Sequence, residues 1–137
     1  MSYLAFISHC AEDTWVARQL SHECSKVGAQ TFLDEAQIAV GANFEHDIIT
    51  ALQKANELVV LITPWALDRP YVWLEIGAAW IRGIPIIAIL LGVSISQFQE
   101  KANVPVALKQ RNLLPLNNVD RYINELSARV NRNEGVV

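Results

Sequence analysis

The sequence predicts an α/β domain, with a five-stranded parallel sheet in the flavodoxin-like order 2-1-3-4-5 and helices on both faces. Two observations lead to this prediction. Short apolar runs, typical of buried strands, alternate with helix-like segments through nearly the whole chain. In addition, residues 57–63 (ELVVLIT) are apolar on both faces, as expected of a central parallel strand.

The first half of the chain contains two predicted strands, residues 3–8 and 30–33. The helix between them stops at Gly28 and carries one apolar face, formed by Val16, Leu20, Cys24 and Val27. We expect a loop over residues 34–42 (DEAQIAVGA). Asn43 then caps a second helix, whose apolar positions are Phe44, Ile48, Leu52 and Ala55.

The second half continues the alternation. After the strand at residues 57–63, a helix starts near Pro70, which suits a first turn, and stops at Gly83. A strand over residues 85–91 follows, and Ser94 with Gln97 resembles a capping box. We expect residues 103–110 to be irregular. The last elements are a strand at residues 111–116 and a helix at residues 119–132.

Length and composition limit the class of protein. The 137 residues suit a single domain over residues 1–132, with a frayed tail at residues 133–137. A hydrophobic fraction of 52% indicates a globular chain, and a net charge of −3 without a basic tract argues against nucleic-acid binding. The two cysteines show no disulfide framework, and no signal peptide or membrane span is visible. These features predict a cytoplasmic location.

Glu75 is the only ionisable side chain between Val72 and Ile81. A charge among apolar neighbours loses solvation unless it is paired or faces a cleft. Ligands of such sheets bind beyond the carboxyl ends of the strands, where the order reverses between the first and third strands. Because Glu75 lies about one turn into the helix after the third strand, we expect it at a cleft. The alternative is a glutamate on the solvent-facing stripe of an amphipathic helix.

Several familiar sites are absent from the sequence. Neither GxGxxG nor GxxxxGK[ST] occurs, which excludes both nucleotide-binding fingerprints. A receiver domain needs an aspartate at the end of the third strand, where this chain has Thr63. We predict no metal or cofactor, because zinc-motif spacing is lacking among His9, Cys10, His22, Cys24 and His46.

Three motifs carry a family resemblance. FISHCAED (residues 6–13), FLDEAQIAVG (residues 32–41) and WLEIG (residues 73–77) occur in an order and at intervals that resemble a Toll/interleukin-1 receptor (TIR) domain, closest to the prokaryotic type. The resemblance is strong over residues 1–92. It implies the five-stranded sheet and, as in many members, cleavage of NAD+ at the nicotinamide–ribose bond in immune or anti-phage signalling.

Glu75 matches the catalytic glutamate of the family by position and by the EIG run that it opens. A carboxylate suits this chemistry, because loss of nicotinamide leaves an oxocarbenium-like ribosyl centre that an anion stabilises. Attack by water gives ADP-ribose, and attack from within the molecule gives a cyclic product. NAD+ is then a substrate and no cofactor is needed.

The resemblance also implies substrate contacts. Ser8, His9 and Cys10 correspond to the nucleotide-side wall, although His9 is equally well explained as an exposed loop residue. Many members have a tryptophan four residues before the glutamate, where this chain has Tyr71. We therefore expect Tyr71 to face the ribose or base and Trp73 to pack. The alternative is that Trp73 is itself the substrate contact.

Other residues near these loops have two interpretations. Arg69 is a phosphate partner or a surface charge, and Trp65 lines the cleft or shields the sheet edge. Glu12 and Asp13 would repel a phosphate and more simply cap the first helix.

The loop at residues 34–42, with Asp34, Ile38, Val40 and Gly41, corresponds to the family's assembly loop. The apolar residues Ile38 and Val40 suit a contact surface, and the alternative is that they fold back onto their own domain. We expect self-association, and a sensor or effector protein as a further partner.

Two other functions compete with NAD+ cleavage: a non-enzymatic TIR adaptor, and a nucleoside-transferring enzyme, for which no second acid is evident.

Overall fold

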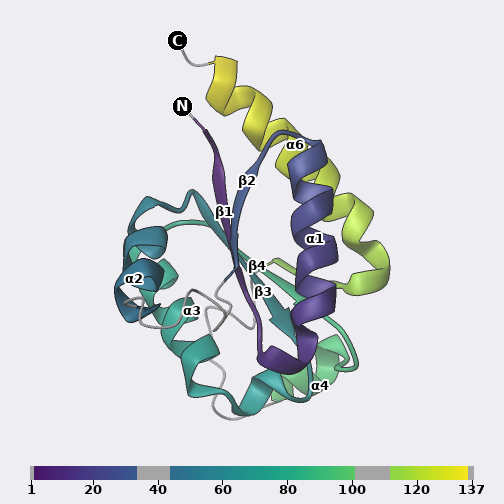
Figure 1. The fold of residues 1–137 in the computed structure, drawn as a ribbon. Coiled ribbons are helices and arrows are strands. Elements are labelled where there is room, and N and C mark those ends of the chain that lie inside the picture. The colour runs from purple at the N-terminus through teal and green to yellow at the C-terminus, as the bar shows by residue number, and fades with distance from the viewer. Residues whose placement is uncertain (1, 34–43, 101–111, 136–137) are drawn as a thin grey trace.

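A five-stranded parallel sheet forms the centre of the protein, seen in a computed structural model that describes residues 2–33, 44–100 and 112–135 (Figure 1). The strand order is β2-β1-β3-β4-β5, which confirms the predicted fold. The strands are β1 (Leu4–Ser8), β2 (Gln30–Leu33), β3 (Glu57–Ile62), β4 (Ile86–Leu90) and β5 (Asn112–Pro115). Because β1 and β3 are neighbours, the order reverses between them, as predicted.

Helices cover both faces of the sheet. One face packs against α1 (Thr14–Lys26) and α6 (Val119–Gly135). The other packs against α2 (Phe44–Lys54), α3 (Pro70–Arg82) and α4 (Ile95–Glu100). Helix α6 continues to Gly135, beyond the predicted end at Arg132. The predicted loop at residues 34–42 and the predicted irregular segment at residues 103–110 lie outside the described residues.

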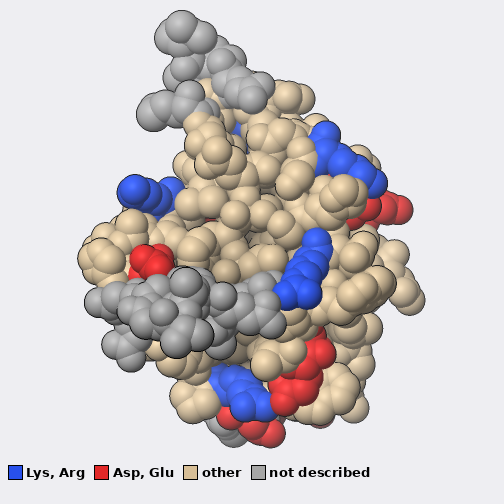
Figure 2. Space-filling model, in the orientation of Figure 1, with Lys and Arg blue, Asp and Glu red and all other residues tan. Residues whose placement is uncertain are grey.

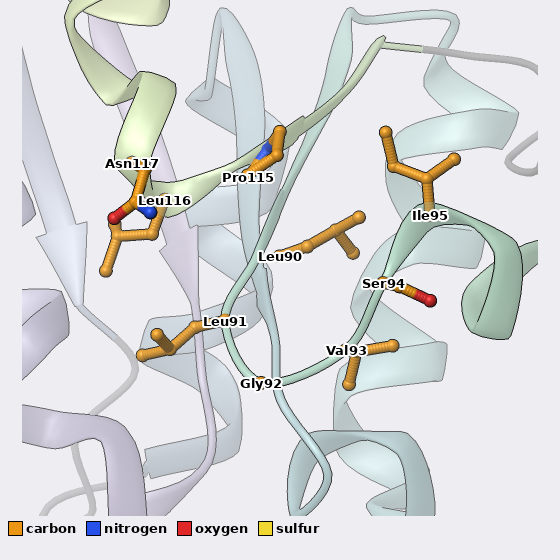
Figure 3. A pocket seen from close by; sticks show the side chains of 9 residues that line it. All are labelled: Leu90, Leu91, Gly92, Val93, Ser94, Ile95, Pro115, Leu116 and Asn117. Atoms are coloured by element: carbon orange, nitrogen blue, oxygen red, sulfur yellow. The ribbon is translucent and has the colours of Figure 1, made fainter.

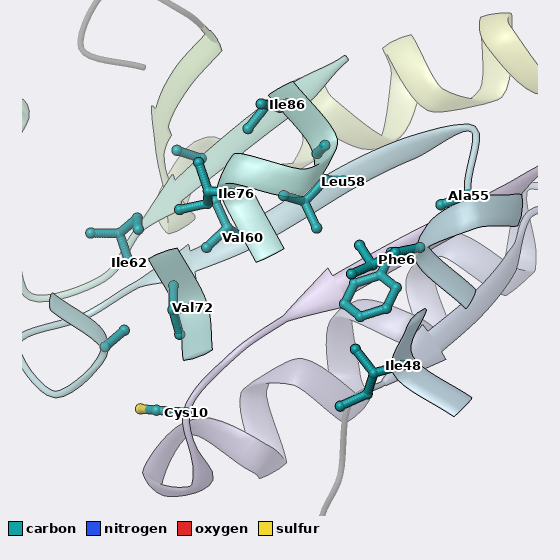
Figure 4. Packing of buried hydrophobic residues seen from close by; sticks show 14 of the residues in the cluster. Phe6, Cys10, Ile48, Ala55, Leu58, Val60, Ile62, Val72, Ile76 and Ile86 are labelled. Atoms are coloured by element: carbon teal, nitrogen blue, oxygen red, sulfur yellow. The ribbon is translucent and has the colours of Figure 1, made fainter. Parts of the chain in front are cut away.

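Side chains of the central strand alternate between two apolar clusters. Leu58, Val60 and Ile62 of β3 point toward α2 and α3. Figure 4 shows Val60 and Ile62 near Val72 and Ile76 of α3, and Phe6 of β1 beside Ile48 of α2. Val59 and Leu61 point toward α1 and α6. A strand buried on both faces carries apolar side chains on both, which is why residues 58–62 of β3 form a continuous apolar run.

The predicted ends of α3 and the predicted cap of α4 are confirmed. Pro70 lies in the first turn of α3, and Gly83 ends the helix in the left-handed conformation with φ of 71°. At α4, the Ser94 N–H donates to Gln97 Oε1 (2.9 Å) and the Gln97 N–H donates to Ser94 Oγ (3.0 Å). Of the described helices, none has the length and apolarity needed to cross a membrane.

A buried carboxylate at the amino end of β3 is a feature that the sequence analysis missed. Glu57 is fully buried and accepts hydrogen bonds from the hydroxyl groups of Tyr3 and Tyr122, each at 2.6 Å. Arg129 of α6 adds two more, from Nε at 2.7 Å and from the terminal nitrogen at 3.2 Å. Burial, together with the neighbouring Glu57 carboxylate, raises the pKa of Tyr122 well above its usual value. Glu57 therefore joins β3 to α6 and to Tyr3, the residue before β1.

We predict that Arg129→Ala lowers the free energy of unfolding by about 3 kcal/mol, because it leaves the Glu57 charge buried with fewer donors. Urea denaturation monitored by circular dichroism measures this change. Arg121→Ala on the same helix is the control, since Arg121 pairs with Glu125 at 3.5 Å in an exposed position and should contribute less than about 0.5 kcal/mol. Equal losses in the two variants would contradict a special role for the Glu57 cluster.

Candidate functional site

Ser8 and Glu75 meet at the carboxyl edge of the sheet. Ser8 ends β1, and Glu75 lies on α3, the helix that follows β3. The Ser8 hydroxyl donates to Glu75 Oε1 at 2.6 Å, and both side chains are fully buried. A short hydrogen bond to a carboxylate is among the stronger neutral–charged contacts in proteins. The structure thus brings together two residues that the sequence analysis proposed for one site.

The burial of Glu75 excludes one of the two interpretations of this residue. It does not lie on a solvent-facing stripe of α3, because its exposed fraction is 0%. The solvent-facing side of α3 instead carries Leu74, Trp80 and Ile81, with exposed fractions of 67%, 59% and 83%. Glu75 also has no open surface of its own, so a ligand reaches its carboxylate only after neighbouring side chains move.

Asp13 and Thr63 form a second buried contact nearby. It joins two segments: the one between β1 and α1, which contains Asp13, and the one between β3 and α3, which contains Thr63. The Thr63 hydroxyl donates to Asp13 Oδ2 at 2.6 Å, and the Cys10 thiol donates to the same oxygen at 2.8 Å. The predicted capping role of the Asp13 side chain is wrong, because Asp13 precedes α1 without making a side-chain cap bond. Its carboxylate is buried and turns instead to the buried hydroxyl and thiol donors, which a charge removed from water requires.

The Cys10 thiol lies inside this contact. Burial raises the pKa of Cys10 to about 12, and the hydrogen bond to Asp13 acts in the same direction. The neutral thiol is therefore the stable form near neutral pH, which makes Cys10 a poor nucleophile.

His9 is also buried, with an exposed fraction of 7%. The interpretation of His9 as an exposed loop residue is therefore wrong.

Arg69 and Glu12 form a third contact between the two segments, at the surface. One Arg69 terminal nitrogen lies 2.6 Å from Glu12 Oε1, and both side chains are partly exposed. Glu12 has a pKa below its usual value, chiefly because of a hydrogen bond to its own backbone and also because of Arg69. Arg69 is thus engaged by a carboxylate, and a phosphate would have to compete with Glu12 for it.

The three aromatic residues predicted near the site differ in exposure. Trp73 packs partly against the core and donates its indole N–H to the carbonyl of Leu67 at 2.9 Å, as its predicted packing role requires. Tyr71 and Trp65 are exposed, with exposed fractions of 42% and 55%.

A depression of about 350 Å³ lies at the carboxyl ends of β4 and β5, away from Glu75 (Figure 3). It is lined by Leu90, Leu91, Gly92, Val93, Ser94, Ile95, Pro115, Leu116 and Asn117. None of these side chains titrates near neutral pH, and none belongs to the predicted site. This depression offers no acid–base chemistry.

The described residues contain no group of three or more His, Cys, Asp or Glu side chains placed to hold a metal ion. The basic side chains visible in Figure 2 are scattered among uncharged ones and form no continuous patch on that face.

The comparisons with known proteins identify the family. The model of the TIR domain family matches residues 5–128, which is most of the chain. The chain belongs to the TIR domain family. None of the curated proteins compared with this TIR domain matches its sequence.

Solved TIR structures share the fold at low sequence identity. The TIR domain of a Toll-related receptor from Hydra magnipapillata aligns with a TM-score of 0.63 and 21% identity, over 88% of this chain and 97% of that one. A metazoan TIR-STING receptor from C. gigas aligns with a TM-score of 0.69 and 22% identity, over 90% of this chain and 40% of the receptor. The TIR domains of the activated Roq1 resistosome align with a TM-score of 0.61 and 17% identity, over 95% and 84%. These likenesses establish the fold.

We predict that Cys10 resists thiol reagents in the folded protein. With the pKa raised from 9.0 to about 12, the thiolate fraction at pH 8 falls roughly 1000-fold, since each pKa unit is a factor of ten. Labelling with an alkylating reagent, followed peptide by peptide with mass spectrometry, should therefore be at least about 100-fold slower than in urea. A Cys10 labelling rate close to that of the unfolded chain would contradict this account of the site.

Proposed function

We propose that this TIR domain cleaves NAD+ at the nicotinamide–ribose bond, with Glu75 as the catalytic carboxylate. The observation that carries the proposal is a buried glutamate on α3, held by Ser8 at the edge of the sheet where the strand order reverses. Proteins keep a charged carboxylate in such a position only with partners, and functional sites are a common reason for doing so.

The carboxylate would act at the ribose. As the bond to nicotinamide breaks, its electron pair leaves with the ring and positive charge develops at the ribosyl carbon. An anion in a dry site stabilises that charge more than water does, because the effective dielectric constant is low. A ribose hydroxyl could replace the Ser8 hydroxyl as the donor to Glu75 Oε1. Water would then attack to give ADP-ribose and a proton, or the adenine or ribose of the same molecule would close a cyclic product.

Access to Glu75 requires a rearrangement, because the carboxylate has no exposed surface. We expect self-association through the sequence-predicted loop at residues 34–42 to favour the open form, as the family resemblance implies. The isolated domain would then be a closed, weakly active form that an upstream sensor or effector protein activates. A cytoplasmic role in immune or anti-phage signalling, in a protein of the prokaryotic type, follows from the same resemblance.

Glu75→Gln should reduce nicotinamide release from NAD+ by at least about 100-fold, because the amide keeps the shape of the side chain and removes its charge. The assay compares wild type and variant at high protein concentration, by chromatography of nicotinamide. Glu57→Gln is the matched control, since it neutralises an equally buried carboxylate at the opposite end of β3. It should retain activity at a temperature at which circular dichroism finds all three proteins folded. Equal release by wild type and Glu75→Gln would remove Glu75 from the mechanism.

The specific activity should rise with protein concentration, because assembly opens the site. A dilution series with light scattering measures activity and association together. Ile38→Asp and Val40→Asp place a charge in the predicted contact surface. Each should keep the specific activity at its low, dilute value at every concentration. A specific activity that does not depend on concentration would contradict activation by assembly.

A TIR adaptor is the second candidate function, favoured by a specific observation. The outer side of α3 exposes Leu74, Trp80 and Ile81 over a helix whose glutamate is fully covered. Exposed apolar side chains grouped on one helix are typical of protein contact surfaces. The adaptor is the better account if wild type releases no nicotinamide even at concentrations at which light scattering detects assemblies.

A further inference from the structure

We propose that Thr63 and Asp13 are positioning residues for Glu75: their buried hydrogen bond holds the segment between β3 and α3 against the segment between β1 and α1 and so fixes where the carboxylate lies. The catalytic consequence of this inference rests on the proposed function. Its structural part, that the contact keeps the two segments together, can be measured without any substrate.

The Thr63 hydroxyl makes two hydrogen bonds of fixed direction, besides a longer contact of 3.9 Å with the Cys10 sulfur. It accepts from the Ala66 N–H at 3.1 Å, so its single proton is left for Asp13 Oδ2 at 2.6 Å. Thr63 is fully buried and Asp13 has an exposed fraction of 3%. Almost no water can replace either partner, so the loss of one leaves the other buried without that hydrogen bond. The pair therefore constrains the two segments more firmly than a surface contact would.

From Thr63, the constraint continues to α3. The Thr63 carbonyl accepts from the Leu67 N–H at 3.2 Å, which folds the turn after β3 back onto its first residue. The Leu67 carbonyl in turn accepts from the Trp73 indole at 2.9 Å. Trp73 stands two residues before Glu75 on the same helix. A shift of Thr63 is thus transmitted to the helix that carries the carboxylate.

From Asp13, the constraint continues to Ser8. The Asp13 N–H donates to the Cys10 carbonyl at 3.0 Å, and its carboxylate accepts from the Cys10 thiol at 2.8 Å. These bonds fold the short segment after β1 into a turn. Ser8, the last residue of β1, directly precedes this segment. Asp13 therefore governs the path of the chain between Ser8 and α1, just as Thr63 governs the path between β3 and α3.

The surface pair between Arg69 and Glu12 joins the same segments but is expected to matter less. Both side chains are partly exposed, and ion pairs at the surface contribute little and weaken with salt. Glu12→Gln should therefore speed the labelling of Cys10 far less than a change at Thr63 does.

The test compares Thr63→Val, which keeps the shape and removes the hydroxyl, with Thr63→Ser, which keeps the hydroxyl. Tyr3→Phe is the matched control, because it removes a hydroxyl donor at the same distance of 2.6 Å from a fully buried carboxylate, Glu57, at the opposite end of the sheet. Two readouts are taken: kcat and KM for nicotinamide release at high protein concentration, and the rate at which Cys10 reacts with an alkylating reagent.

We expect Thr63→Val to lower kcat by about 100-fold, as displaced catalytic groups do, with KM changed by less than about twofold. Its Cys10 labelling should be at least about tenfold faster, because the segment opens locally. Thr63→Ser should restore both values, and Tyr3→Phe should change neither, although it lowers stability. If Thr63→Val behaves like Tyr3→Phe in both readouts, the inference is overturned. If wild type releases no nicotinamide at all, the proposed function fails, and the labelling comparison alone upholds or overturns the positioning contact.

Discussion

A carboxylate removed from water has to be matched by hydrogen-bond donors, and this requirement organises both ends of the central strand. At the amino end, Glu57 gathers donors from Tyr3, which precedes β1, and from α6. Beyond the carboxyl end, Asp13 and Glu75 gather donors from Thr63 and Ser8. All three acids are buried, and their contacts join segments that lie far apart in the sequence. The apolar clusters hold the layers together, while these carboxylates set how the segments at the two edges are placed.

The two edges differ in the donors that they offer. Glu57 accepts four hydrogen bonds, two of them from a guanidinium group, which suits a carboxylate that stays charged and fixed. Glu75 Oε1 accepts from the hydroxyl of Ser8, a neutral donor. Under the proposed function, Glu57 anchors the amino edge of the sheet and Glu75 acts at the carboxyl edge.

The fold was predictable because each strand and helix has a local cause that can be read in the sequence. The apolar run of β3, the Pro70 and Gly83 ends of α3 and the capping box at Ser94 all appear where the pattern places them. The side-chain contacts were less predictable, since they join distant segments. Glu57 looks like an ordinary first strand residue until Tyr122 and Arg129 are brought to it. Thr63 was noticed only because it is not an aspartate, although a polar residue ending an apolar strand was a signal. The full burial of Glu75 depends on neighbouring segments and could not be read from the helix alone.

The Glu57 anchor has a practical consequence for anyone who shortens the domain or fuses it to another protein. Tyr3 lies near one end of the chain and Arg129 near the other, so both termini contribute a donor to the same carboxylate. A version trimmed past either residue would leave a charge stranded in the interior and should express poorly. Tags and fusion partners therefore belong outside Tyr3 and beyond Val130, where α6 itself can serve as a rigid connector.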